Sequence, residues 1–125
     1  MADHAKLSAS GAKKWLACTP SASLEATLPN ESSEYAATGT FAHAVFEHRL
    51  LGYLGRKQSV ECENRLPGAD KYYSEDLCGP VQDAVEFAIQ RIEAARSVCK
   101  DPVILLEQRL DFSPLVPEGF GTGDL

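Results

Sequence analysis

The sequence has 125 residues, of which 44% are hydrophobic and 24% charged, a composition typical of one small globular domain over residues 1–125. No segment approaches the about eighteen consecutive apolar residues of a membrane-spanning helix, and no apolar signal segment follows the N-terminus. We therefore expect a protein of the cytoplasm of a bacterial host. The net charge of −6 argues against nucleic-acid binding over the whole surface, because phosphate contacts need Lys and Arg.

The cysteines do not predict a metal site. The sequence contains Cys18, Cys62, Cys78 and Cys99, and no two of them form the Cys-x-x-Cys pair that is typical of structural zinc sites. In a cytoplasmic protein we expect all of them to carry free thiols. Cys18 is expected to be a buried structural residue.

The N-terminal region is predicted to form short helices. Ser8 or Ser10 is the expected N-cap, and the helix should cover residues 12–17 and end before Pro20. Trp15 is expected to anchor this helix in the core. A further short helical turn is predicted within residues 21–28.

A longer helix is predicted after a polar loop at residues 29–34. We expect this helix to begin at Thr38 or Thr40 and to continue to about Leu54, with Gly55 as its C-terminal glycine. Residues 56–70 are polar, with a turn at Pro67-Gly68.

The clearest periodicity lies in residues 80–99. Apolar residues recur there at the spacing of an amphipathic helix: Val81, Ala84, Val85, Ala88, Ile89, Ile92, Ala95 and Cys99. Pro80 suits the first turn of such a helix, and Asp101-Pro102 should end it. We expect its apolar face to pack against the strand that follows.

The C-terminal region is predicted to be β-structure. Residues 103–106 form an apolar run that predicts a strand continuing to Asp111. Residues 113–120 contain proline and glycine and predict a hairpin connection, and another strand begins at Gly121. Helices followed by the start of a mixed sheet indicate the α+β class.

One set of residues suggests metal chemistry. Asp124 follows a strand and is preceded by Gly123, while His43 and Glu47 are four residues apart and so share one face of the predicted helix. Phosphodiester cleavage needs oxygen ligands around Mg²⁺ or Mn²⁺, often with one imidazole. Glu107 is instead expected to be half-exposed in its strand or paired with the neighbours of Arg109, and not to be a site residue.

These motifs resemble the RecB-type nucleases of the PD-(D/E)XK superfamily, in a phage- and prophage-encoded branch similar to CRISPR-associated and lambda-type exonucleases. The resemblance spans residues 7–125 and is carried by Ser8-Ala9-Ser10, Trp15 to Pro20, Gly39-Thr40-Phe41-Ala42-His43 with Glu47, Glu107, and Gly121-Thr122-Gly123-Asp124. It implies an α/β-type nuclease fold of which this chain is the N-terminal, truncated part. It also implies that His43 and Asp124 are metal ligands, with Glu47 supporting His43 from behind.

The resemblance also implies what the chain does not contain. An acidic residue, one intervening residue and a lysine are expected on the strand after Leu125, and no earlier segment has that spacing. We therefore expect weak or no binding of Mg²⁺ or Mn²⁺ and no catalysis by these 125 residues alone. With the missing motif, the function would be that of a metal-dependent DNA exonuclease.

A second function stays open at this point. An acidic phage protein with a nuclease-like fold could bind and inhibit a host defence nucleoprotein complex, as an anti-CRISPR protein does. The expected partners are therefore DNA, if the site is completed, or a protein that adds a strand to the exposed sheet edge. The same edge favours association of two copies of the chain.

Overall fold

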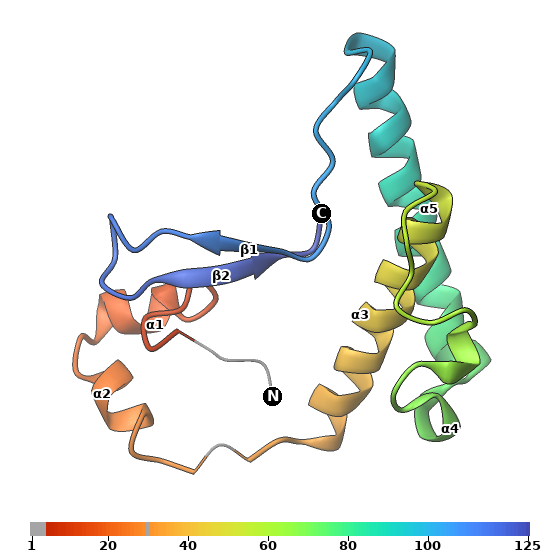
Figure 1. The fold of residues 1–125 in the computed structure, drawn as a ribbon. Coiled ribbons are helices and arrows are strands. Elements are labelled where there is room, and N and C mark those ends of the chain that lie inside the picture. The colour runs from red at the N-terminus through yellow and green to blue at the C-terminus, as the bar shows by residue number, and fades with distance from the viewer. Residues whose placement is uncertain (1–4, 30) are drawn as a thin grey trace. The chain divides into compact units, whose positions relative to one another are not determined.

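A computed structural model describes residues 5–29 and 31–125 (Figure 1). The described residues form five α-helices, one 3₁₀ turn and a two-stranded antiparallel sheet, which confirms the predicted α+β class with helices first. The chain divides into two compact units. The hairpin unit combines the segment up to Glu31 with the segment from Leu105 onward, and the helical unit is residues 32–104.

The hairpin unit contains two short helices and the sheet. Helix α1 (Ala12–Ala17) and helix α2 (Ser21–Glu25) occupy the predicted ranges, and strands β1 (Gln108–Asp111) and β2 (Phe120–Gly123) form the hairpin. The predicted serine N-cap of α1 is wrong, because Gly11 holds the N-cap position and no side chain caps the helix.

Trp15 was predicted to anchor α1 in the core, and Cys18 was predicted to be buried. Trp15 is half-buried, and its indole Nε1 donates to the Ser8 carbonyl at 2.9 Å. Cys18 is exposed, so its prediction as a buried residue is wrong. It lies at the C-cap of α1 in an extended conformation, where the helix no longer directs its side chain toward the apolar face.

The helical unit is built on two long helices, α3 (Glu34–Tyr53) and α5 (Glu75–Val98), which pack against each other (Figure 1). Between them lie a 3₁₀ turn, η1 (Glu63–Arg65), and a short helix, α4 (Ala69–Tyr72). The core of this unit consists of buried residues from these elements and of Leu66, which follows η1: Phe41, Val45, Leu50, Leu66, Ala69, Val81, Val85, Ala88 and Ile92. No helix among the described residues is both long and apolar enough to cross a membrane.

Both long helices begin earlier than predicted, because serines cap them. The Ser33 hydroxyl accepts from the Ala36 amide at 3.2 Å, and the Ser74 hydroxyl accepts from the Leu77 amide at 3.3 Å. Thr38 was a predicted start of α3, but its hydroxyl donates to the Glu34 carbonyl inside the helix. Pro80 lies inside α5 rather than in its first turn.

The predicted packing of the 80–99 helix against a strand at 103–106 is wrong. Residues 103–106 are not a strand, and Val103 and Leu105 are 84% and 50% exposed. The apolar face of α5 is covered by α3 instead. Strand β1 begins at Gln108, the first residue that pairs with β2, and not at residue 103 as predicted.

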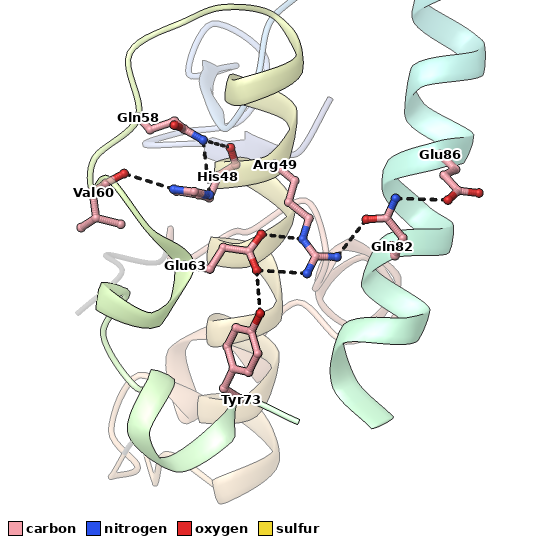
Figure 2. Close-up of polar contacts among 8 residues, drawn as sticks. All are labelled: His48, Arg49, Gln58, Val60, Glu63, Tyr73, Gln82 and Glu86. Carbon is pink, nitrogen blue, oxygen red and sulfur yellow. Dashed lines mark hydrogen bonds and ion pairs between the residues drawn. The ribbon is translucent and has the colours of Figure 1, made fainter. Parts of the chain in front are cut away.

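A polar cluster joins the segment after α3 to both long helices (Figure 2). Arg49 on α3 binds Glu63 through two N–H groups at 2.6 and 3.0 Å and donates to Gln82 on α5 at 2.9 Å. Tyr73 donates to the same Glu63 carboxylate at 3.0 Å. The hydrogen bonds from Arg49 hold the pKa of Glu63 below its usual value.

A second contact fixes the same segment. His48 is buried on α3, and its Nε2 lies 3.1 Å from the Val60 carbonyl, which accepts the ring N–H. The Gln58 amide donates to the His48 carbonyl at 2.7 Å (Figure 2). These bonds attach the segment after α3 to His48, a buried residue of that helix.

The α3–α5 interface gives a direct test of the core. Val85→Ala should lower the free energy of unfolding by about 2 kcal/mol, since two buried methyl groups are lost and a cavity remains. Val98→Ala is the matched control, because it is the same substitution on the same helix at a residue that is 88% exposed, whereas Val85 is 3% exposed. Urea unfolding measures both. Equal effects of the two substitutions would contradict this packing.

The Glu63 carboxylate makes stability depend on pH. Because its pKa is lowered in the folded state, its contribution is present above the usual value near 4.5 and is lost as the pH falls through the folded-state value. Glu63→Gln should cost about 2 kcal/mol at neutral pH, and the difference from wild type should shrink in acid. Glu61→Gln, at a side chain that is 86% exposed, should change little at any pH. Urea unfolding across the acid range tests both variants.

Candidate metal centre

The hairpin brings Glu107 and Asp124 together. Its antiparallel register pairs Gln108 with Gly123 and continues to Asp111 with Phe120. One position before this register, the Glu107 amide donates to the Asp124 carbonyl at 3.1 Å. The backbone therefore places these two acidic residues opposite each other at the open end of the hairpin.

Their side chains form a carboxylate pair. A carboxylate oxygen of Glu107 and one of Asp124 lie within 4.8 Å of each other, with Glu107 half-buried and Asp124 exposed. Oxygen atoms at this spacing can bind one hard divalent cation, which takes carboxylate ligands in preference to sulfur. Of the two, Asp124 was a predicted metal ligand and Glu107 was not, and both belong to the hairpin unit.

Glu107 has an unusual backbone. Its φ of 50° lies in the left-handed region, which costs a residue with a Cβ about 1–2 kcal/mol. Glu118, in the connection at the other end of the hairpin, has a similar φ of 53°. Strained residues persist only where the surrounding structure holds them. At Glu107 the bond to Asp124 provides such a restraint.

The predicted helix ligand lies in the helical unit. His43 is exposed on α3, and Glu47, one turn later on the same face, is half-buried. Their side-by-side placement on one helix is as predicted. Because His43 and Asp124 belong to different units, their joint binding of a metal stays a prediction.

Glu107 was not predicted as a site residue from its own position. The sequence placed it within a strand that began at residue 103, where alternation made it an ordinary half-exposed residue. The register could have identified it: once 108–111 is paired with 120–123, the residue before the first strand faces the residue after the second.

Comparison with known proteins gives a family without an assigned activity. A family described as "Protein of unknown function (DUF2800)" matches residues 4–125. The chain belongs to this family. No solved structure matches it. The description of DUF2800 names no function, so the proposal for this chain rests on its own residues.

The connection between β1 and β2 helps to fix the strand register, and this register places Glu107 opposite Asp124. A Cβ on Gly119 would lie 2.6 Å from two ring carbons of Phe112 and 2.8 Å from the Val116 carbonyl oxygen. Gly119→Ala should therefore destabilise this DUF2800 chain by about 1–3 kcal/mol. Thermal and urea unfolding measure the loss.

Gly121→Ala is the control for this substitution. A Cβ on Gly121 would lie 3.6 Å from the nearest atom, the Phe112 Cε1, which is an ordinary contact. The control should be neutral or slightly stabilising, because alanine restricts the unfolded chain more than glycine does. A Gly119→Ala variant as stable as Gly121→Ala would contradict the tight turn.

Proposed function

We propose that this chain carries the metal-binding half of a phosphodiester-cleaving site in a RecB-like nuclease fold that acts on DNA. The observation that carries the proposal is the Glu107–Asp124 carboxylate pair at the open end of the hairpin. The resemblance of the surrounding motifs to RecB-type nucleases supports it, because Asp124 matches the strand carboxylate of that family.

The donor atoms fit Mg²⁺ or Mn²⁺. Glu107 and Asp124 offer carboxylate oxygens, and the proposal adds the imidazole of His43 as the third ligand, with Glu47 orienting that ring from one turn away. Such a cation polarises the phosphate and lowers the pKa of a bound water. The protein side chains themselves hold the cation and fix where the phosphate can approach.

The proposal assigns metal binding, and not the complete reaction, to these 125 residues. A lysine that assists the attacking water does not occur here in the acidic-x-Lys spacing. We therefore expect no DNA cleavage by this chain alone, and we expect cleavage when that motif is supplied.

Mn²⁺ binding tests the proposal. Isothermal titration should detect weak binding by the wild-type chain, and Glu107→Gln, Asp124→Asn and His43→Ala should each weaken it about tenfold or more. Glu118→Gln is the matched control, because Glu118 shares the left-handed backbone of Glu107 but lies in the connection at the far end of the hairpin. That control should bind Mn²⁺ like wild type.

The variants separate the parts of the proposal. Equal binding by Glu107→Gln, Glu118→Gln and wild type would exclude the carboxylate pair as a metal site. Wild-type binding by His43→Ala, with loss in both carboxylate variants, would remove His43 from the ligand set and leave the pair. Unfolding curves in EDTA show whether each variant is folded.

A further inference from the structure

The carboxylate pair shares one face of the hairpin with an arginine. Side chains alternate between the two faces along a strand, so Thr122 and Asp124 point to the same side of the hairpin, and Arg109, which pairs with Thr122, shares that side. The Glu107 carboxylate joins this face through its partner, because it lies within 4.8 Å of the Asp124 carboxylate. Arg109 is therefore the next side chain along this face from the proposed metal ligands.

An aromatic ring holds the arginine in place. The guanidinium carbon of Arg109 lies 3.9 Å from the centre of the Phe120 ring, which is a cation–π contact. Stacking uses the flat face of the guanidinium, and its N–H groups lie along the edge, where they match the oxygens of a phosphate. A cation fixed in this way loses little rotamer freedom when it binds an anion.

A hollow lies beside this contact. Its volume is about 480 Å³, and its lining residues are Arg109, Asp111, Ser113, Glu118, Gly119 and Phe120. Its lining carries two carboxylates and one guanidinium, so the hollow itself does not favour an anion.

The charges on the face restrict where a phosphate can lie. Glu107, Asp124 and Asp111, whose charge interacts with that of Arg109, carry −3 against +1 from Arg109, and one divalent cation would bring the sum from −2 to 0. Asp111 and Glu118 line the hollow toward the turn and repel a phosphate there. Asp111 accepts from the Ser113 amide at 2.9 Å, which lowers its pKa and keeps it ionised. An anion is therefore favoured only at the open end, and only with the cation.

We propose that Arg109 binds a phosphodiester group of a DNA strand and positions it against the cation on Glu107 and Asp124. This inference rests on the proposed function and adds the residue that recognises the substrate backbone. Arg109 acts as a positioning residue whose guanidinium takes one non-bridging oxygen while the cation takes another. Phe120 sets the direction of the guanidinium.

The test uses the full 125-residue chain and a fluorescein-labelled single strand of about twelve thymidines. Fluorescence anisotropy gives its affinity with and without Mn²⁺ at several salt concentrations, and a gel confirms that the strand stays intact. Wild type should bind it about tenfold more tightly with Mn²⁺. Arg109→Gln should weaken binding in Mn²⁺ about tenfold and lower the slope of log affinity against log salt by about 0.7, the value for one phosphate contact.

Two further variants complete the design. Arg91→Gln makes the same substitution at an exposed site on α5 and should keep the wild-type slope and affinity within about twofold. Arg109→Lys keeps the charge, so it should retain the slope while losing part of the affinity, because an ammonium does not reproduce the planar fork. A purely structural role of Arg109 would not separate slope from affinity in this way.

The outcomes distinguish this inference from the proposed function. An Arg109→Gln variant with wild-type affinity and slope overturns the inference, as does equal DNA affinity with and without Mn²⁺. Failure of the wild-type chain to bind the strand while it still binds Mn²⁺ overturns the inference alone. Failure to bind Mn²⁺ in the titration overturns the proposed function itself. Arg109→Gln should not weaken Mn²⁺ binding, because it removes a positive charge from the same face, and a loss of Mn²⁺ affinity overturns the phosphate role.

Discussion

The pairing of two four-residue strands is the constraint on which the candidate site depends. A two-stranded hairpin is marginally stable by itself, so it needs support from other segments. The hairpin unit supplies this by combining the chain up to Glu31 with the chain from Leu105 onward, and Gly121 lies close to Ala9. A shift of one residue in the register would move Asp124 away from its place opposite Glu107. The carboxylate pair therefore exists only in this pairing.

The helical unit shows how a small core is completed by polar contacts. Few large side chains are fully buried, and Phe41, Val45 and Leu50 are the largest. The connection between α3 and α5 is polar, and Arg49 binds it through Glu63 (Figure 2). Such a part-buried ion pair adds modest net stability, but removal of one partner is costly. The ion pair fixes the position of the connection relative to α3.

The chemistry of the hairpin face follows from the order of its charges. Carboxylates lie at the open end, the stacked Arg109 is next, and further carboxylates lie toward the turn. A net charge of −6, if it were spread evenly over the surface, would disfavour DNA binding. In the proposed site, a divalent cation at the carboxylate pair would neutralise the local negative charge, so binding of a polyanion would depend on the metal. Acidity and DNA recognition are compatible under that condition.

The sequence by itself determined the elements whose signal is local. The α+β class, the short helices at the N-terminus and the periodic face of α5 follow from side-chain spacing, because a helix buries one stripe wherever its partner lies. It also predicted Asp124 as a metal ligand, from its place after a strand. It did not show which of several possible N-cap residues precedes each long helix. Both helices begin earlier than expected, after Ser33 and Ser74. The partner of α5 and the position of Glu107 opposite Asp124 were decided only by the tertiary structure. Burial and register depend on residues far away in the sequence, and no local pattern specifies which of several apolar or acidic segments will meet.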